Sequence, residues 1–216
     1  LKLSALSIPG THDSASNRVG DTSFSSSFYI TQYRTSTIRN QLDNGVRFLD
    51  IRCNQINDAC AIHHGAVYLF QNLTDVLSEV YGFLDAHKSE TVIMSIKDGE
   101  ATAVSNTLSF SEVINNYIKN DTGNRWYVAA TVPRLGDVRG KIVLMRRFGD
   151  TKIPLGINAS SNWPGNTDGS WTSSDGVGFI VQDYYNVPVF TSYDEKKRMI
   201  VSTLDKASSP NTSADT

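Results

Sequence analysis

Short runs of apolar and β-branched residues alternate with longer amphipathic stretches, and this alternation limits the possible folds of the chain more than any other feature. Residues 91–96 and 141–148 have the length and composition of buried strands. Residues 74–86 carry apolar side chains at helical spacing, namely Val76, Leu77, Val80, Phe83 and Leu84. Strands separated by helices of this length are typical of an α/β fold with a mostly parallel sheet.

The same patterns predict an order of elements for the whole chain. We expect helices at 38–44 (capped by Thr37), 74–86, 101–122 and 193–204, a loop or short helices at 14–37, and a long loop at 156–176. We expect six strands, at 3–8, 46–52, 60–63, 91–96, 141–148 and 177–181. The last twelve residues are polar, and we expect them to be disordered.

The bulk composition excludes several classes of protein. The chain has 216 residues, of which 39% are hydrophobic, enough for one soluble domain with its own core. Its formal net charge of −2 predicts no general attraction to nucleic acid or anionic lipid. No apolar run reaches the roughly 20 residues that cross a bilayer. The chain starts on its first expected strand without a signal peptide, which we interpret as a mature or trimmed product.

Two cysteines, Cys53 and Cys60, lie close together in the sequence. A parallel crossover needs about a dozen residues or more, so we expect a hairpin-like return between them that brings the thiols within reach of a disulfide. The pair favours a secreted protein, although two free thiols in a cytosolic protein are the alternative. Asn-x-Ser/Thr sequons point the same way and occur at Asn72, Asn120, Asn158 and Asn211.

A His-Asp pair follows the first apolar run. In Leu6-Ser7-Ile8-Pro9-Gly10-Thr11-His12-Asp13-Ser14, proline removes a backbone donor and glycine permits a turn, so we expect the strand to end there. His12 and Asp13 would then lie at the carboxyl end of a strand, where α/β barrels carry their catalytic residues. In the strand at 46–52, alternation places Asp50 and Arg52 on one face.

The ends of the expected strands collect one set of polar side chains. Two histidines at different strand ends can divide general-base and general-acid work on a phosphodiester, and guanidinium groups stabilise charge on phosphate oxygens. The set therefore suits an anionic substrate. Its members are His12, Asp13, Asp50, Arg52, His64, Lys97, Arg147, Asp183 and Tyr185.

The motifs that hold this set resemble a known family, the X-type catalytic domain of phosphatidylinositol-specific phospholipase C in its small bacterial form. The pieces occur in the family's order along nearly the whole chain. They are Ser7-Ile8-Pro9-Gly10-Thr11-His12-Asp13-Ser14, Phe48-Leu49-Asp50-Ile51-Arg52, His63-His64-Gly65 with Tyr68-Leu69, Ile93-Met94-Ser95-Ile96-Lys97, Arg139-Gly140-Lys141-Ile142-Val143-Leu144 and Val181-Gln182-Asp183-Tyr184-Tyr185.

The resemblance implies an irregular TIM-type (β/α) barrel and a reaction. It implies cleavage of phosphatidylinositol to diacylglycerol and inositol 1,2-cyclic phosphate, with slow opening to inositol 1-phosphate. His12 would be the general base, and His64 the general acid, assisted by Asp13, while Arg52 would hold the phosphate. The inositol pocket would be lined by Asp50, Lys97, Arg147, Asp183 and Tyr185, with Asp50 either touching substrate or orienting Arg52. His64 is assigned rather than His63 because it precedes glycine.

Metal independence is also expected. Animal-type members bind Ca²⁺ through carboxylates and an asparagine, whereas here a cation, Arg52, occupies that neighbourhood, and arginine repels a divalent ion. We therefore expect no metal and no cofactor.

The resemblance also leads to expectations about how much of the domain the chain contains and about its partners. Six strands are two fewer than a closed barrel contains, so we expect a single domain over 1–216 that lacks its last two strands and the aspartate that orients the base histidine. We expect a secreted enzyme in peripheral contact with membranes that contain phosphatidylinositol, with GPI anchors as a further possible substrate and no nucleic-acid partner. Aromatic residues that would dock on lipid, or else pack on the barrel, are Phe24, Phe28, Tyr29, Trp163 and Trp171.

Two other readings remain open. One is a catalytically inactive domain that binds inositol lipids. The other is a related phosphodiesterase acting on other lipids, although such enzymes use carboxylates to hold a divalent ion, which Arg52 disfavours.

Overall fold

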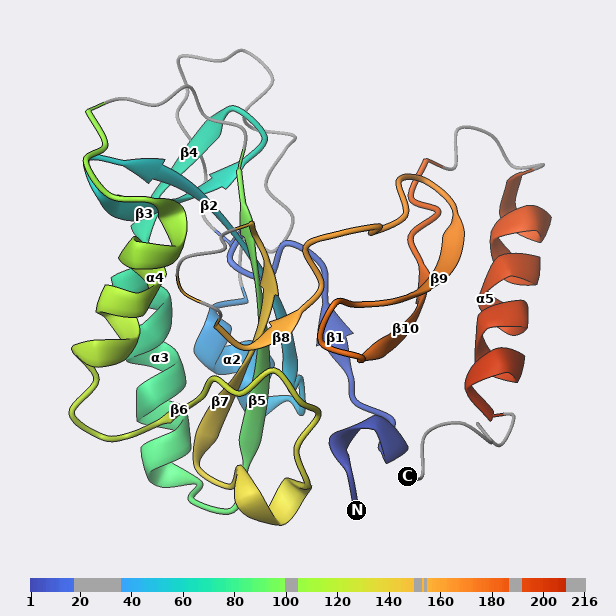
Figure 1. The fold of residues 1–216 in the computed structure, drawn as a ribbon, viewed down its shortest axis with the longest axis horizontal. Coiled ribbons are helices and arrows are strands. Elements are labelled where there is room, and N and C mark those ends of the chain that lie inside the picture. Colours follow the sequence, from blue (N-terminus) through green and yellow to red (C-terminus); the bar gives the residue numbers. More distant parts are fainter. Residues whose placement is uncertain (18–35, 100–104, 150–152, 154, 187–191, 209–216) are drawn as a thin grey trace. The chain divides into compact units, whose positions relative to one another are not determined.

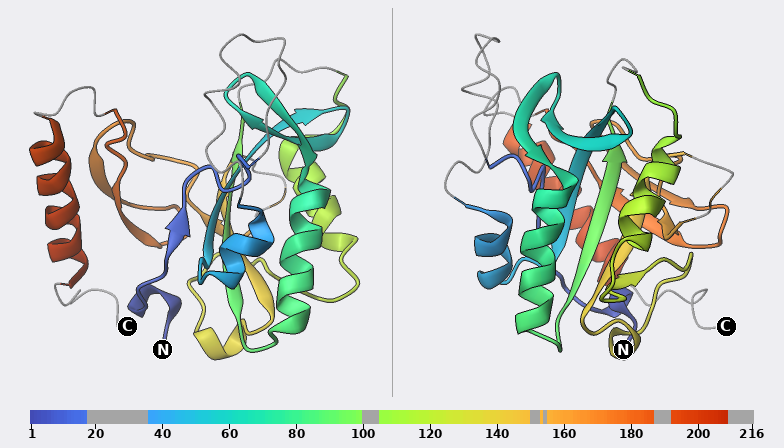
Figure 2. Two further views of the ribbon diagram at one scale, coloured as in Figure 1. Left: turned by 180° about the vertical axis from the view of Figure 1, so that it is seen from behind. Right: turned by 90° about the vertical axis from the view of Figure 1, so that its left-hand side faces the viewer.

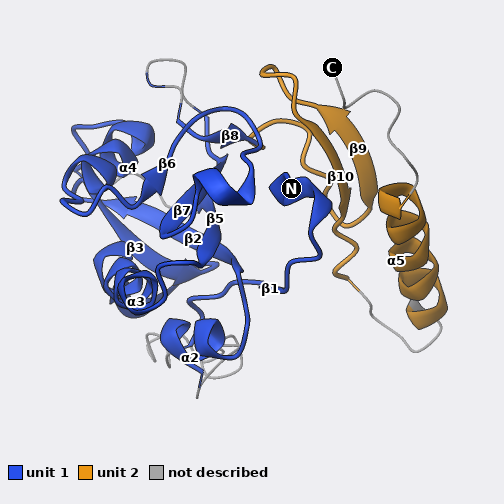
Figure 3. Ribbon diagram, turned by 90° about the horizontal axis from the view of Figure 1, so that it is seen from below, with its two compact units in different colours: residues 1–158 blue, residues 159–216 orange. Residues whose placement is uncertain are grey.

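The computed structural model describes residues 1–17, 36–99, 105–149, 153, 155–186 and 192–208. Predictions that fall elsewhere, including the docking role of Phe24, Phe28 and Tyr29, lie outside the described residues. The chain forms two compact units, Leu1–Asn158 and Ala159–Thr216, coloured separately in Figure 3.

The first unit is built on an eight-stranded sheet (Figure 1). Parallel pairing joins neighbouring strands in the order β1–β2–β5–β7–β8, and β6 also pairs in parallel with β7. β3 and β4 form an antiparallel hairpin, and β3 pairs antiparallel with the carboxyl-terminal half of β2. The bounds are β1 Gly10–Thr11, β2 Phe48–Ile56, β3 Ala59–His64, β4 Val67–Asn72, β5 Thr91–Asp98, β6 Trp126–Tyr127, β7 Lys141–Arg147 and β8 Ile157–Asn158. The predicted α/β class with parallel strands is confirmed, and the described strands do not close into a barrel.

Helices cover one face of this sheet, where Figure 2 shows α3 and α4 side by side. The unit contains α2 (Ile38–Asp43), α3 (Leu73–Ala86) and α4 (Phe110–Lys119), besides the 3-10 helices η1 (Leu3–Ala5) and η2 (Leu135–Asp137). The sheet residues that face the helices are apolar and fully buried, which makes this interface the hydrophobic core. They include Leu49, Ile51, Met94, Ile96 and Leu144.

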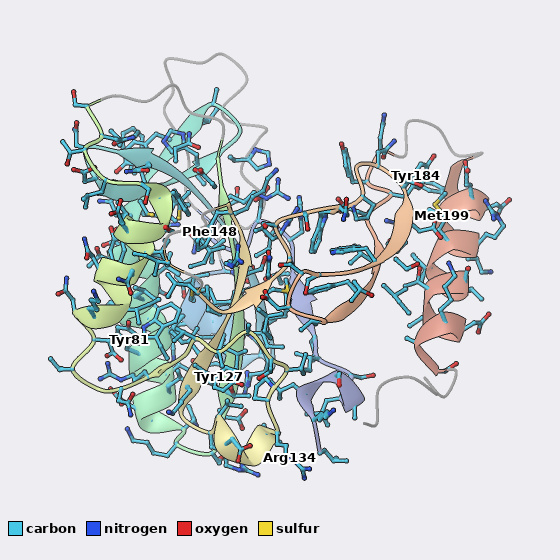
Figure 4. The ribbon with its side chains drawn as sticks, in the orientation of Figure 1. Tyr81, Tyr127, Arg134, Phe148, Tyr184 and Met199 are labelled. Atoms are coloured by element: carbon cyan, nitrogen blue, oxygen red, sulfur yellow. The ribbon has the colours of Figure 1, made fainter. Side chains whose placement is uncertain are left out.

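Local chemistry explains where the helices begin. Thr37 accepts a hydrogen bond from the backbone N–H of Asn40 and caps α2 as predicted. Ser109 and Glu112 form a capping box, so α4 begins at Phe110, and residues 101–104 of the predicted 101–122 helix lie outside the described residues. α3 matches its prediction, with all five expected apolar residues buried. Tyr81 of this helix is labelled in Figure 4, and its hydroxyl accepts a hydrogen bond at 2.8 Å from the indole of Trp126 in β6.

The first strand was predicted in the wrong place. Residues 3–5 form η1, and the strand comes later, at Gly10–Thr11, where it pairs with Phe48 and Leu49 of β2. The Leu3 N–H donates to the Pro133 carbonyl at 2.9 Å, so the apolar run packs on a connector instead of a neighbouring strand. Gly10 is needed for close approach and not for a turn, because a Cβ there would lie 3.0 Å from the Cβ of Phe48.

The cysteine hairpin forms, but the disulfide does not. Cys53 pairs with Ile62 and Cys60 with Gln55, so the thiols occupy a diagonal rather than a directly opposed position. Both are free and buried. The hydrogen bond with Cys60, together with burial, raises the pKa of the Cys53 thiol well above its usual value.

The second unit contains a two-stranded antiparallel sheet and one helix. β9 (Asp168–Thr172) pairs with β10 (Gly178–Gln182), and α5 spans Ser192–Ser208. The predicted loop 156–176 was therefore wrong, since it contains β8 and β9, and the predicted strand at 177–181 pairs with β9 and not with the parallel sheet. α5 confirms the predicted helix and extends to Ser208, so the first part of the predicted disordered tail is helical.

The two loop tryptophans pack within the second unit. Trp171 stacks on Phe179 at 4.9 Å between ring centroids, and Trp163 meets Trp171 edge-on at 6.0 Å. Tyr184 lies beside α5 (Figure 4), and its hydroxyl donates to Glu195 at 3.5 Å. This packing favours the structural reading of Trp163 and Trp171 over a docking role.

Candidate active site

The segment after β1 is fixed to β2 by backbone and side-chain hydrogen bonds around Asp50. The Asp13 N–H donates to Asp50 Oδ2 at 3.1 Å, and the Ser14 N–H donates to the Asp50 carbonyl at 2.8 Å. In return the Asp50 N–H donates to Ser14 Oγ at 2.8 Å. Asp13 adopts a left-handed φ of 44°, which turns the chain sharply after His12. These contacts place the His-Asp pair directly over the carboxyl half of β2.

Polar residues that the sequence did not single out support this turn. Thr11 Oγ1 donates to Gln41 Oε1 at 2.7 Å, and Gln41 Nε2 donates to the Ser14 carbonyl at 2.8 Å. On the other side, Gln71 Nε2 donates to the Ala15 carbonyl at 2.5 Å. Ser14 and Gln41 are almost completely buried. Gln41 and Gln71 show in the sequence only as polar residues at positions of otherwise apolar pattern, which is why they were missed, whereas Ser14 belongs to the motif around His12.

His12 lies against two carboxylates. Its Nδ1 is 3.3 Å from Asp50 Oδ2, and its Nε2 is 3.5 Å from Asp13 Oδ2. The side chain of His12 is 52% exposed, whereas those of Asp13 and Asp50 are 2% and 8% exposed. The hydrogen bond with Asp50 raises the pKa of His12 above its usual value, although partial burial opposes the shift. Asp50 therefore contacts the predicted base, which the sequence did not indicate.

Asp50 remains ionised despite its burial. Burial alone would raise the pKa of this carboxyl, but the hydrogen bond from His12 and the nearby Arg52 charge lower it to about 2. Arg147 adds to this effect, with its Nη1 at 3.4 Å from Asp50 Oδ1. A buried carboxylate held by one imidazole and two guanidinium groups is a fixed negative charge at the base of the site.

Asp13 connects Arg52 to His64. Arg52 Nε lies 2.7 Å from Asp13 Oδ1 and 3.2 Å from Asp50 Oδ2. His64 Nε2 lies 3.2 Å from Asp13 Oδ2, on the oxygen that also faces His12. The predicted general base and general acid therefore flank one buried carboxylate.

The adjacent histidine, His63, faces away from this cluster. Its ring packs on Tyr68 at 5.4 Å between centroids, and burial lowers its pKa. The extended strand thus directs one imidazole to each side, as alternation requires. Of the two, His64 is the one that the structure brings to Asp13.

Three neighbouring strands place their cations in one layer. Arg52 of β2 is in register with Lys97 of β5, and Lys97 is in register with Arg147 of β7. Residues in register on a parallel sheet point to the same face, so the three side chains share the face of Asp50, opposite the helices. Two carboxylates, Asp13 and Asp50, accompany these three cations, which leaves the layer suited to an anion.

The other two predicted site residues belong to the second unit. Asp183 Oδ2 accepts a hydrogen bond from the Trp163 indole at 3.0 Å, and Tyr185 is exposed. Their contacts are therefore given within the second unit alone. Within the described part of the chain, no group of three or more histidine, cysteine, aspartate or glutamate side chains is arranged to hold a metal ion.

The fold and the cluster define a class: an α/β protein with two imidazoles on a shared carboxylate, beside a layer of cations that fits a phosphate ester. A model of the phosphatidylinositol-specific phospholipase C X domain family matches residues 6–148. The chain belongs to this family, which confirms the resemblance seen in its motifs.

Two curated proteins with similar sequences carry the same enzyme name. A 1-phosphatidylinositol phosphodiesterase of Listeria monocytogenes is 35% identical over 95% of this chain and 60% of its own length. One from Staphylococcus aureus is 32% identical, over 95% of this chain and 66% of its own length. The chain thus spans less than two thirds of the length of these curated relatives.

Solved structures of bacterial phosphatidylinositol-specific phospholipases C are also similar to this chain. A structure of the Staphylococcus aureus phosphatidylinositol-specific phospholipase C superposes with a TM-score of 0.82 and 30% identity, covering 97% of this chain and 70% of that one. The Listeria monocytogenes enzyme superposes with a TM-score of 0.68 and 29% identity, over 95% of this chain and 70% of that one. These likenesses confirm the predicted TIM-type α/β fold class.

Proposed function

We propose that this protein is a phosphatidylinositol-specific phospholipase C that releases diacylglycerol and forms inositol 1,2-cyclic phosphate. The observation that carries the proposal is the placement of His12 and His64 on either side of Asp13, beside Arg52. The named activity of the relatives supports the same substrate.

In the first step His12 acts as general base. Its Nδ1 faces Asp50, so a proton held there leaves the Nε2 lone pair free to accept the proton of the inositol 2-hydroxyl. The 2-oxygen then forms a bond to phosphorus as the bond from phosphorus to the glycerol oxygen breaks. His64 gives its proton to that oxygen, and diacylglycerol leaves. Asp13, 3.2 Å from His64 Nε2, orients the acid.

The cations stabilise the charge that develops on phosphate. Arg52 is already oriented by Asp13 and Asp50, so its remaining guanidinium N–H groups are held in place for the non-bridging oxygens. Lys97 and Arg147 lie in the same layer and would bind inositol hydroxyls or phosphate oxygens. In a slower second step, water would take the place of the 2-hydroxyl and open the ring to inositol 1-phosphate.

The reaction would not need a divalent ion. Arg52 satisfies the two carboxylates that could otherwise bind one, since it lies within 3.2 Å of both. A guanidinium cannot be a ligand and repels a divalent cation. We expect activity to be the same in a calcium chelator.

Further parts of the proposal rest on the family resemblance. Asp183 and Tyr185 would contact inositol, and GPI anchors would be a second substrate. We also propose that the protein is secreted and that it meets its lipid as a peripheral membrane protein. Among the described residues, no helix has both the length and the apolar character to traverse a bilayer.

Phosphorus NMR of the chain with phosphatidylinositol vesicles, in the presence of a calcium chelator, tests the proposal. A cyclic phosphodiester signal that is absent with the variant His12→Ala is the expected result. Vesicle binding without turnover would favour an inactive lipid-binding domain. Turnover of other lipids in preference to phosphatidylinositol would favour a different phosphodiesterase.

A further inference from the structure

A cavity of about 290 Å³ lies at the amino ends of β2 and β5, between the N-terminal segment and the connector that contains η2. Apolar side chains form much of its wall, among them Leu6, Ile8, Ile93 and Leu135. Three charged side chains also line it, namely Arg47, Glu90 and Arg139. The proposed mechanism uses none of these residues, so the cavity is separate from the candidate active site.

The two sites lie at opposite ends of the same strand. Thr91 lines the cavity and begins β5, whereas Lys97 of the cation layer lies six residues later. Because a strand rises about 3.3 Å per residue, the cavity and the cation layer are about 20 Å apart along β5. A ligand in this cavity would therefore not occupy the place of the substrate.

The cavity stays open because the N-terminal segment is attached to the rest of the unit at its two ends. The Leu3 N–H donates to the Pro133 carbonyl at 2.9 Å, and the Arg47 N–H donates to the Pro9 carbonyl at 2.9 Å. Between these attachments, residues 6–8 pair with no strand in the described part of the chain. The segment therefore faces the start of β5 across the cavity instead of packing directly against it.

The negative charge in the wall is offset within the protein. Glu90 would repel an anion, but Arg47 Nε lies 2.8 Å from Glu90 Oε2. Arg47 Nη1 also donates to the carbonyls of Leu42 and Val46, so this guanidinium is held by the protein itself. With Glu90 balanced by Arg47, Arg139 leaves one positive charge in excess in the cavity wall.

Arg139 is the group that a ligand would meet. Its Nη1 donates to the Ser89 carbonyl at 2.8 Å, which orients the guanidinium at the wall. Among the described residues, no carboxylate forms an ion pair with it. A guanidinium has five N–H donors in a planar fork, so donors remain for a carboxylate or a phosphate.

Apolar walls beside an unbalanced guanidinium favour one class of ligand. An anion without an apolar part would leave the walls in contact with water, and a cation would be repelled by Arg139. A methylene group is about the size of a water molecule, about 30 Å³, so the cavity holds about ten non-hydrogen atoms. We infer that it binds a small amphiphilic anion, with a hydrocarbon chain against Leu6, Ile8 and Ile93 and a carboxylate or phosphate on Arg139. This inference does not depend on the proposed phospholipase activity.

Isothermal titration calorimetry of the chain with single-chain amphiphiles, each below its critical micelle concentration, tests the inference. Decanoate and decyl phosphate are the two anionic probes, and the one that binds more tightly identifies the head group. Decanol should bind about three- to tenfold more weakly, a modest difference because Arg139 is exposed and solvent screens its charge. Decyltrimethylammonium should not bind detectably.

Substitutions in the wall separate the two parts of the site. Arg139→Gln should weaken decanoate binding by about three- to tenfold, and Arg139→Lys should restore most of it. Arg134→Gln is the matched control, because Arg134 (labelled in Figure 4) lies in the same connector but not in the cavity wall. Leu135→Trp should fill the cavity and prevent binding with an unchanged circular dichroism spectrum, since Leu135 is half-buried at its rim.

Competition distinguishes this cavity from the cation layer of the active site. Saturating inositol 1-phosphate should leave the affinity for decanoate unchanged. Four results would overturn the inference: no binding of either anion, equal binding of decyltrimethylammonium, displacement of decanoate by inositol 1-phosphate, or undiminished binding by both Arg139→Gln and Leu135→Trp. Because none of these measurements requires turnover, they report on the cavity even if the chain has no phospholipase activity.

Discussion

At the scale of single residues, Asp50 determines the electrostatics of the site. It was predicted to line the substrate pocket, yet its two oxygens are occupied by His12, Arg52 and Arg147. The sequence could place Asp50 and Arg52 on one face because strand alternation is regular. It could not show the contact with His12, which depends on the turn after β1 and on the left-handed Asp13. The structure thus places Asp50 against His12, whereas the resemblance expects the orienting aspartate in a later strand.

The ionisation of Asp50 predicts an acid limit to stability. Its pKa is lowered from 3.8 to about 2, so it contributes about 2 kcal/mol that is fully present above pH 4 and is lost as the pH falls through 2. Urea unfolding between pH 4 and pH 2 should show this loss in the parent and a smaller pH dependence in Asp50→Asn. Equal slopes in the two proteins would show that other carboxylates dominate acid unfolding.

The same contact predicts the pH profile of the reaction. A general base must be unprotonated, so the raised pKa of His12 places the acidic limb of kcat/KM above the usual histidine value of 6.5. Asp50→Asn should move that limb to lower pH and reduce the maximum by between about 10²- and 10⁴-fold. A reduced maximum with an unmoved limb would indicate that Asp50 acts only through Arg52.

Loss of His64 should depend on the substrate, because a general acid accelerates the reaction more when the leaving group is more basic. His64→Ala should nearly abolish cleavage of phosphatidylinositol, by about 10²- to 10⁴-fold, and should have much less effect on an inositol phosphodiester with a nitrophenol leaving group. His12→Ala should impair both substrates. Equal losses on both substrates for His64→Ala would contradict the assignment of His64 as the acid.

At the scale of elements, the sequence predicted those strands whose apolar pattern is decided by the core. β5 and β7 are buried against helices, and α3 matched its predicted stripe, because hydrophobic periodicity reports directly on burial. β1 was misplaced because its pairing depends on Gly10 and Thr11, which carry no apolar signal. The short strands β8 and β9 were missed for the same reason, since their segments are rich in glycine, serine and asparagine.

The close approach of β1 to β2 can be tested with glycine substitutions. In Gly10→Ala the new Cβ would lie 3.0 Å from Phe48 Cβ and 3.3 Å from its carbonyl oxygen, so β1 or Phe48 must give way by a few tenths of an ångström. We expect a loss of about 1–3 kcal/mol in unfolding free energy and reduced activity, because His12 follows two residues later.

Gly82→Ala in α3 is the matched control for this substitution. Nothing lies within 4 Å of its added Cβ, so the helix should gain about 0.5–1 kcal/mol with no change in activity. If Gly10→Ala were as stable and as active as the parent, the tight β1–β2 contact would not be what positions His12.

At the scale of the whole molecule, charge and hydrophobicity act on different partners. The net charge is −2, so the chain as a whole has no electrostatic preference for an anionic surface. Three of its 20 lysine and arginine residues, Arg52, Lys97 and Arg147, nevertheless share one layer of the sheet. Recognition of a phosphate would therefore be local and electrostatic, whereas attachment to a neutral membrane would depend on apolar contact.

This separation predicts opposite responses to salt. Raising sodium chloride from about 0.05 to about 0.5 M shortens the Debye length from about 14 to about 4 Å and weakens exposed charge interactions. Inhibition by inositol 1-phosphate should weaken several-fold over this range, because that ligand binds through the cation layer. Partitioning onto phosphatidylcholine vesicles should stay constant or rise, since burial of apolar surface is not screened. Vesicle binding that falls with salt as steeply as inhibition does would mean that cations, and not apolar contact, hold the protein at the lipid surface.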